Sequence, residues 1–162
     1  MNVRPLRDDE RERVIAAGLG LARLPRGDGS FYLVAWDGDE PLGHAHLALA
    51  NPPEVQDVEV LEQHRGRGIA TALLAAAERE AAARGHRRLT LTVSEGKPEV
   101  RALYERRGFR DAGVPPRRVT GTVQIRTGPL EVDDTLLTLE KTLSIPGSPV
   151  RRTSDTDHGR TP

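Results

Sequence analysis

The sequence predicts an α/β (α+β) domain in which helices flank a mixed, mostly antiparallel central sheet. Segments rich in β-branched, aromatic and aliphatic residues, such as 31–36 and 89–93, are bounded by turn residues. Asp37-Gly38 joins two such segments with the chemistry of an antiparallel hairpin. Apolar residues three or four positions apart mark helices between the later strands. The predicted order is β-α-β-β-β-α-β-α-β-β.

Composition bounds the class of protein. A chain of 162 residues suits one domain, and its formal net charge of zero argues against nucleic acid or an anionic membrane as a partner. The absence of cysteine excludes disulfides, a thiol nucleophile and a thiolate metal site. The first ten residues are too charged for a signal peptide and no apolar run approaches membrane-spanning length, so we expect a cytoplasmic protein.

The first third of the chain predicts a strand, a helix and a hairpin. The acidic run Asp8-Asp9-Glu10 favours the start of a helix, because carboxylates stabilise the positive end of the helix dipole. Glycine and proline in 24–29 predict a loop after it. The predicted elements are strand 3–6, helix 8–22, and strands 31–36 and 42–49.

The remainder predicts strands that alternate with two helices. These elements are strand 54–60, helix 71–84, strand 89–93, a helix from Pro98 to Gly108, and strand 135–143. Between the last two, 114–134 is ambiguous: 119–125 has β character and Gly128-Pro129 interrupts it. Residues 144–162 are rich in Ser, Pro, Gly, Thr and Arg, which predicts a disordered tail after a domain of residues 1–143.

A glycine-containing loop, Arg65-Gly-Arg-Gly-Ile-Ala70, lies between a predicted strand and a predicted helix. The first N–H groups of a helix lack intrahelical acceptors and carry partial positive charge, so this arrangement is suited to a phosphate. A Walker A loop is excluded, because the next lysine is Lys97. A dinucleotide fingerprint fits poorly, because Thr71 occupies the third small position.

The loop does fit the pattern [R/Q]-x-x-G-x-[G/A], through Arg65, Gly68 and Ala70. The segment 103–109, Leu-Tyr-Glu-Arg-Arg-Gly-Phe, fits L-Y-E-x-x-G-F, and 139–143 fits a closing strand. In this order these features resemble the GCN5-related N-acetyltransferase (GNAT) family over most of residues 30–143. That family binds acetyl-coenzyme A, so the resemblance implies a GNAT-like sheet whose strands 54–60 and 89–93 splay apart at the cofactor site.

The resemblance also implies which residues bind acetyl-CoA and which act in catalysis. Backbone of the loop holds the pyrophosphate, and strand 54–60 pairs with the pantetheine arm. The implied cofactor-binding residues are Val58, Val60, Leu61, Arg65, Gly66, Arg67, Gly68, Ile69, Ala70 and Thr71. Tyr104 matches the family tyrosine that protonates the leaving thiolate, and a phenol pKa of about 10 suits that role. A tyrosine on an amphipathic helix equally serves packing alone.

Glu54 occupies the position where the family often carries a general base. Strand alternation places Glu54, Gln56 and Val58 on one face, with the competing bases Asp57 and Glu59 on the other, unless a bulge intervenes. A water chain is a third route for the proton. A solvated glutamate at the start of a strand is as consistent with the sequence as a catalytic one.

His44 and His46 alternate onto one face of their strand. They lie either at the acceptor pocket or on plain sheet surface, and no further ligand cluster accompanies them, so we expect no metal.

The activity that the resemblance implies is transfer of an acetyl group from acetyl-CoA to a primary amine by direct attack. A small-molecule amine and a peptide are both open as acceptors, with the enzyme as a monomer or homodimer. The alternative is a non-catalytic acyl-CoA-binding sensor module of the same fold.

Overall fold

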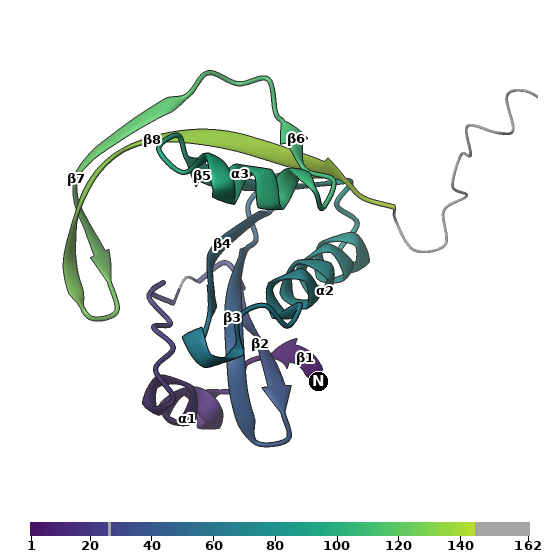
Figure 1. The fold of residues 1–162 in the computed structure, drawn as a ribbon, viewed down its shortest axis with the longest axis vertical. Coiled ribbons are helices and arrows are strands. Elements are labelled where there is room, and N and C mark those ends of the chain that lie inside the picture. Colours follow the sequence, from purple (N-terminus) through teal and green to yellow (C-terminus); the bar gives the residue numbers. More distant parts are fainter. Residues whose placement is uncertain (26, 145–162) are drawn as a thin grey trace, which may run out of the picture.

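The structure, a computed structural model, describes residues 1–25 and 27–144, so the predicted tail after residue 144 lies outside the described residues (Figure 1). Thirteen elements follow one another. They are β1 (Asn2–Pro5), the 3₁₀ turn η1 (Asp8–Glu10), α1 (Arg11–Ala16), β2 (Phe31–Asp37), β3 (Glu40–Ala48), β4 (Glu54–Val60), the 3₁₀ turn η2 (Glu62–His64), α2 (Ile69–Ala83), β5 (Arg88–Ser94), α3 (Pro98–Glu105), β6 (Arg110–Asp111), β7 (Arg117–Ile125) and β8 (Gly128–Thr142).

One sheet contains every strand of the described residues. Its order is β1-β2-β3-β4-β5-β8-β6, and β7 pairs with β8 beside this path. All neighbours are antiparallel except β4 and β5, which are parallel. The prediction of a mixed, mostly antiparallel sheet flanked by helices is therefore confirmed.

Two hydrophobic clusters lie on opposite faces of this sheet. The larger one contains the apolar face of α2, where Ile69, Leu73 and Leu74 are buried as their helical spacing predicts. The smaller one joins Val14 of α1 to the residues of β2 that face away from α2, among them Trp36. Residues of β2 alternate between the two clusters, which is the period of a strand buried on both faces.

The strands β4 and β5 diverge. Their parallel pairing contains only Glu54 with Thr90 and Val55 with Leu91, at the start of β4. From Gln56 onward β4 has no partner on that side in the described part of the chain. The edge of β4 that faces β5 is therefore open, as the predicted splay requires.

A bulge in β4 alters the direction of its side chains. His46 of β3 lies opposite Gln56, but His44 lies opposite Glu59, so β4 carries one extra residue between these two pairs. Asp57, inside the bulge, has a φ of 51°, in the left-handed region that L residues rarely adopt. Aspartate is among the residues that tolerate this conformation best.

The predicted face assignment in β4 is wrong because of this bulge. Glu54, Gln56, Asp57 and Glu59 all lie on the face of the β3 histidines, to which three of them are bonded or paired. Val58 instead packs against the α2-side cluster. One inserted residue thus gathers four polar side chains on one face of the sheet.

The first helix is shorter than predicted. It ends at Ala16 rather than near residue 22, and Gly18 follows with a φ of 107°. Leu19 and Leu21, which the helical pattern placed on an apolar face, are buried from an irregular segment instead. The apolar pattern identified buried residues correctly, but Gly18 and Gly20 allow the chain to leave the helix.

An ion pair fixes the start of this helix against β1. The Glu10 carboxylate accepts hydrogen bonds from the Arg4 guanidinium at 2.7 Å and from the Arg7 backbone N–H at 3.0 Å. Only 7% of Glu10 is exposed. The hydrogen bonds from Arg4 lower the pKa of Glu10 to about 2, against the opposing effect of burial.

The ambiguous segment 114–134 forms a long β-hairpin. β7 and β8 pair continuously from Arg117 with Leu136 to Ile125 with Gly128. The β segment does end at Ile125, but residues 126–127 form the turn, and Gly128-Pro129 already belongs to β8. Proline is tolerated because its missing N–H falls on the unpaired side of β8. Figure 1 shows the hairpin curving away from the sheet towards the coil that follows α1.

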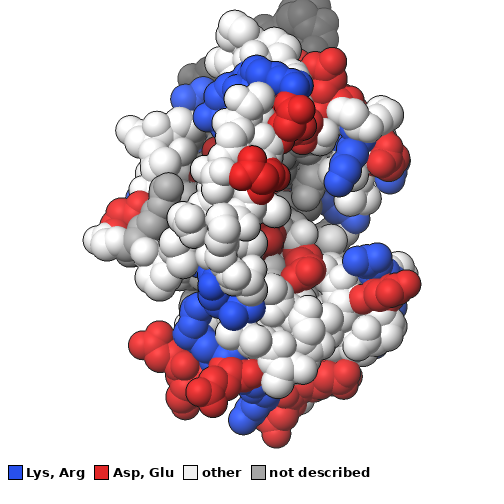
Figure 2. Space-filling view, turned by 90° about the vertical axis from the view of Figure 1, so that its left-hand side faces the viewer, with Lys and Arg blue, Asp and Glu red and all other residues white. Residues whose placement is uncertain are grey.

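The surface in Figure 2 carries charges of both signs. Acidic side chains gather at its lower end, where α1 and the β2–β3 turn lie, and basic side chains lie among and above them. No helix in the described ranges is long and apolar enough to cross a membrane.

Candidate active site

The glycine loop has the backbone conformation that a close ligand requires. Gly66 and Gly68 have φ angles of 77° and 79°, in the left-handed region. A Cβ added at either glycine would meet nothing within 4 Å, so the space above the loop is open. Glycine at these positions therefore serves both the turn and access to the backbone.

Unengaged backbone N–H groups converge at the same place. From Gly66 to Thr71, none of the backbone N–H groups donates to a backbone carbonyl of the described chain, and Gly68 caps the start of α2. They border a cavity of about 220 Å³, the loop pocket. Its lining residues are Val60, His64, Arg65, Gly66, Gly68, Ile69, Ala70, Thr71, Leu103 and Arg107. The N-terminus of a fifteen-residue helix makes this pocket electropositive.

Arg107 belongs to this pocket, and sequence reasoning missed it. Its guanidinium donates to Thr71 Oγ1 at 2.7 Å and to the Leu103 carbonyl at 3.1 Å, which holds the charge beside the loop. In the motif of residues 103–109 it fills a variable position. Its proximity to Thr71 follows from the packing of α3 beside the α2 N-terminus, which no local pattern predicts.

The predicted pantetheine strand borders the same pocket. Val58 and Val60 pack their side chains against the α2-side cluster, and at both residues β4 lacks a pairing with β5. Leu61 differs, because its N–H donates to the Leu42 carbonyl of β3 at 3.0 Å. The Arg65 side chain donates to the Val60 carbonyl at 3.2 Å, which ties the loop to the end of the strand.

A second cavity of about 230 Å³, the Glu54–Tyr104 pocket, continues along β4. It is lined by Arg23, Glu54, Val55, Gln56, Asp57, Val58, Leu91, Thr92, Val100 and Tyr104. Both pockets are bordered by β4 and α3: Val60 and Leu103 line the first, Val58 and Val100 the second. The structure thus brings Glu54 and Tyr104 to one end of a path that begins at the glycine loop.

Tyr104 is held so that its hydroxyl stays protonated. It is half-buried on α3, with its ring edge-on to Phe109 at a centroid distance of 6.1 Å. Burial raises the pKa of Tyr104 above its usual value of 10, and the nearby Arg107 charge opposes part of that effect. Burial thus favours the neutral form of the hydroxyl, which can donate a hydrogen bond.

Glu54 is connected to the neighbouring strand through an amide. Gln56 Nε2 donates to Glu54 Oε1 at 3.0 Å, and Gln56 Oε1 lies 3.2 Å from His46 Nδ1. Since an amide oxygen only accepts, His46 carries the proton on Nδ1 in this contact. The chain His46–Gln56–Glu54 fixes the orientation of the carboxylate. Both histidines are buried rather than on plain sheet surface: His44 is 0% exposed and His46 is 4% exposed.

Of the two competing bases, Asp57 lies in this pocket and Glu59 does not. Asp57 Oδ2 accepts hydrogen bonds from Tyr32 Oη at 2.6 Å and from the Ala22 N–H at 3.2 Å. Glu59 Oε1 accepts from the Gly20 N–H at 2.8 Å. Both carboxylates therefore also hold the segment that follows α1.

That segment is fixed by four consecutive backbone N–H groups, which define the clamped loop, residues 20–23. The groups of residues 20, 21, 22 and 23 donate to Glu59, His44, Asp57 and Tyr32 at 2.8 to 3.2 Å. From the other side, the hairpin tip residue Arg126 donates to the carbonyls of residues 20 and 22 at 2.9 and 2.8 Å. Arg23 of the clamped loop lines the Glu54–Tyr104 pocket, and the hairpin supports this loop through Arg126.

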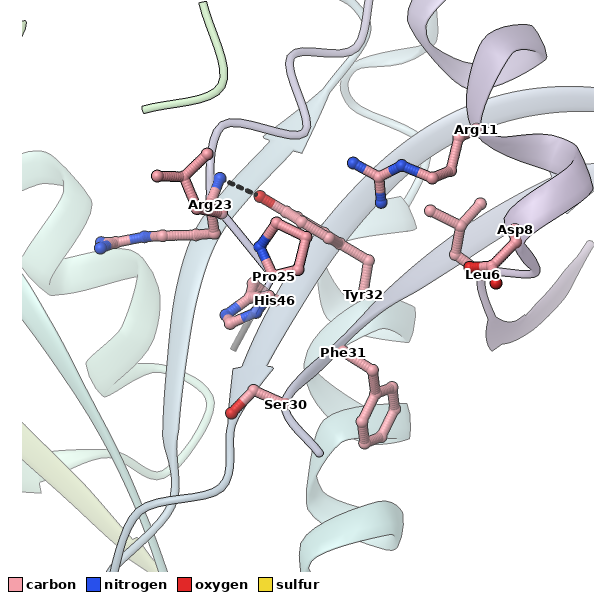
Figure 3. Close-up of a pocket in the computed structure, with 10 residues that line it drawn as sticks. Leu6, Asp8, Arg11, Arg23, Pro25, Ser30, Phe31, Tyr32 and His46 are labelled. Atoms are coloured by element: carbon pink, nitrogen blue, oxygen red, sulfur yellow. Dashed lines mark hydrogen bonds between the residues drawn. The ribbon is translucent and has the colours of Figure 1, made fainter. Parts of the chain in front are cut away.

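A further cavity of about 200 Å³ lies beyond the clamped loop, between α1 and β2 (Figure 3). Tyr32 and His46 form the wall between it and the Glu54–Tyr104 pocket, because each bonds a residue of that pocket. Figure 3 shows the hydrogen bond from the Arg23 N–H to Tyr32 Oη, and the Arg23 side chain pointing away from Tyr32 and His46. Arg23 lines both cavities.

The comparisons with known proteins decide the family. The sequence matches the model of the acetyltransferase (GNAT) family over residues 4–109, well over half of the chain. The chain belongs to the GNAT acetyltransferase family. The matched range of this GNAT protein includes the glycine loop, Glu54 and Tyr104. No curated protein matches the sequence.

Solved acetyltransferase structures share the fold of this GNAT protein. The *Escherichia coli* ribosomal-protein-S18-alanine N-acetyltransferase has a TM-score of 0.67 at 17% identity, over 93% of this chain and 99% of that one. Nourseothricin acetyltransferase has a TM-score of 0.65 at 19% identity, over 88% and 98%. Spermidine/spermine N-acetyltransferase from *Vibrio cholerae* has a TM-score of 0.65 at 14% identity, over 87% and 91%. At these identities the similarity is one of fold.

Within residues 1–25 and 27–144, no group of three or more His, Asp or Glu side chains is arranged to hold a metal ion. The histidines and carboxylates of β3 and β4 instead bond to backbone and to one another. The polar face of the sheet in this GNAT protein is thus a hydrogen-bonded scaffold.

Proposed function

We propose that this GNAT protein is an acetyl-CoA-dependent N-acetyltransferase that acts on a primary amine by direct attack. The observation that carries the proposal is the path along β4 and α3. It starts at open glycine backbone and unengaged N–H groups and ends where Glu54 and Tyr104 line one pocket. A phosphate-containing thioester bound along this path would place its acyl end beside an acid and a base.

The loop pocket fits the pyrophosphate of coenzyme A. The N–H groups from Gly66 to Thr71 supply donors, the start of α2 supplies a favourable dipole, and Arg107 adds a fixed positive charge. Arg65 and Arg67 flank the loop and add further charge. The open edge of β4 at Val58 and Val60 offers backbone groups to the pantetheine arm.

Bound acetyl-CoA supplies the acetyl thioester, and the protein supplies proton transfer. Glu54 accepts a proton from the ammonium form of the acceptor, so that the neutral nitrogen forms the new C–N bond as the C–S bond breaks. Tyr104 donates its hydroxyl proton to the departing sulfur. The second proton that the nitrogen loses returns to Tyr104 through solvent, and Glu54 releases the first proton to solvent, so that the amide, free CoA thiol and one proton are the products.

Glu54 is the better candidate base of the two carboxylates in the pocket. Asp57 already accepts two hydrogen bonds at one oxygen and holds the clamped loop in place. Glu54 accepts one hydrogen bond, from Gln56, and is half-buried. We therefore assign proton removal to Glu54 and electrostatic attraction of the ammonium group to both carboxylates.

Two measurements on the full chain test the proposal. Calorimetry with acetyl-CoA measures binding, and thiol release from acetyl-CoA across a panel of amines measures turnover. Binding with acceptor-dependent thiol release is the expected result. Binding without release for any amine would instead indicate the non-catalytic sensor. Absence of binding would contradict the assignment of the loop pocket as well.

A further inference from the structure

Arg23 is a charged residue of the Glu54–Tyr104 pocket for which acetyl transfer to an amine has no use. The carboxylates of Glu54 and Asp57 match the ammonium form of an acceptor, whereas a guanidinium would repel it. We propose that the acceptor carries a carboxylate besides its amine, and that Arg23 binds this carboxylate. The inference rests on the proposed function, because it names the substrate class of the same site.

The Arg23 guanidinium is available for a ligand. Arg23 is exposed, and its side chain forms no hydrogen bond or ion pair with any residue in the described part of the chain. Figure 3 shows this side chain directed away from Tyr32 and His46, so it does not fill the cavity between α1 and β2. Arginine presents five donors in a planar fork that matches a carboxylate.

The backbone that carries Arg23 is fixed before any ligand arrives. Its own N–H donates to Tyr32 Oη at 2.8 Å, and the N–H of Ala22 donates to Asp57. The Arg126 N–H donates to the Ala22 carbonyl at 2.8 Å from the hairpin side. Because the Cα position is set, less entropy is lost when the guanidinium engages a ligand than on a free loop.

The hydrogen bonds of the clamped loop also fix Arg23 relative to the carboxylates. Asp57 bonds both Tyr32 and the clamped loop, so the negative and positive groups of the pocket belong to one network. An acceptor with an ammonium group near Glu54 and Asp57 and a carboxylate near Arg23 satisfies both signs of charge. A diamine of the same length would place a second ammonium beside the guanidinium, which disfavours it.

The test compares matched acceptors that differ by a carboxylate. These are L-phenylalanine with 2-phenylethylamine and L-lysine with cadaverine, each followed by thiol release from acetyl-CoA. The expected kcat/KM is at least tenfold higher for the amino acid of a pair. Arg23→Gln should lower it for the amino acid by about 10- to 100-fold, mainly through KM, the range of a charge-assisted hydrogen bond.

The same substitution should not lower kcat/KM for the carboxylate-free amines and should raise it for cadaverine, because the guanidinium no longer repels a second ammonium, and Arg23→Lys should restore part of the loss for the amino acids. Arg79→Gln is the matched control, because Arg79 lies on α2, which covers the opposite face of the sheet. Equal kcat/KM within both pairs would overturn the proposal. So would an equal loss for both members in Arg23→Gln, which would mean that Arg23 only neutralises the pocket.

Binding separates failure of this inference from failure of the proposed function. If acetyl-CoA binds and no amine is turned over, equilibrium binding of the same four probes to the CoA-loaded protein decides the matter. Tighter binding of the amino acids, lost in Arg23→Gln, would support carboxylate recognition without turnover. Equal or absent binding of all four probes would overturn it.

Discussion

Replacing Tyr104 by phenylalanine removes one hydroxyl group and leaves the ring that packs edge-on against Phe109. The Tyr104 hydroxyl forms no hydrogen bond with the described residues, so its loss leaves no buried partner unsatisfied. We expect the free energy of unfolding to change by less than about 0.5 kcal/mol, as for a substitution without such a partner. Acetyl-CoA affinity should also be unchanged, because the loop pocket does not include Tyr104.

Turnover should respond in the opposite way. General acid catalysis contributes about 10² to 10⁴ in rate, so kcat should fall by that factor, equivalent to about 3–5 kcal/mol in activation free energy. The assay is thiol release at saturating acetyl-CoA and acceptor, with calorimetry for cofactor affinity. An unchanged kcat would refute the assignment of Tyr104 as the acid and leave it a packing residue.

Tyr32, the other tyrosine of the chain, is the matched comparison. Its hydroxyl donates to Asp57 and accepts from the Arg23 N–H, so Tyr32→Phe should cost about 1–3 kcal/mol and lower Tm by several degrees. Tyr104→Phe and Tyr32→Phe both remove one hydroxyl oxygen, and only Tyr104→Phe should leave the free energy of unfolding nearly unchanged.

Because burial raises the pKa of Tyr104, the kcat of the wild-type protein should show no alkaline decline below pH 10. An alkaline pKa below 10 that disappears in Tyr104→Phe would contradict that cause.

Three further outcomes test the site and its support. Gly68→Glu should abolish acetyl-CoA binding by placing a carboxylate in the loop pocket. Gly85→Glu, at an equally open glycine of similar φ, should retain it, and calorimetry on both separates strain from charge. Arg107→Gln should weaken acetyl-CoA binding by about tenfold, the lower end for one charge-assisted contact, whereas Arg106→Gln at its exposed neighbour should not. Glu10 has a folded pKa of about 2 against 4.5 unfolded, so its ion pair with the β1 guanidinium stabilises fully above pH 4.5. That contribution should be lost as the pH falls from 4.5 to 2. A Glu10→Gln variant whose Tm falls as steeply over this range would exclude Glu10 as the cause.

Local patterns predicted the strand, glycine loop and helix on one side of the site well, although they missed Arg107. The glycine spacing at 66 and 68, the apolar face of α2 and the strand before the loop are contiguous in sequence, and the structure forms them as expected. Here each residue's neighbours in sequence are also its neighbours in space. Periodicity and turn chemistry therefore carry enough information.

The side of the site formed by β4 and the clamped loop was predicted less well, because its decisive features are not local. The bulge at Asp57 reverses the expected faces of β4, and it shows itself in the register with β3. The end of α1 at Ala16 depends on Leu19 and Leu21 reaching the core from an irregular segment. The contact of Arg126 with the clamped loop joins segments that share no pattern.

The hydrogen bond between Arg126 and Gly20 closes a loop of 106 residues, whereas the glycine loop forms from neighbouring segments. Closing so long a loop lowers the conformational entropy of the chain before the favourable contact energy is gained. The glycine loop is therefore expected to form early in folding, and the clamped loop late. A change at Arg126 is therefore expected to loosen the clamped loop and to leave the glycine loop formed.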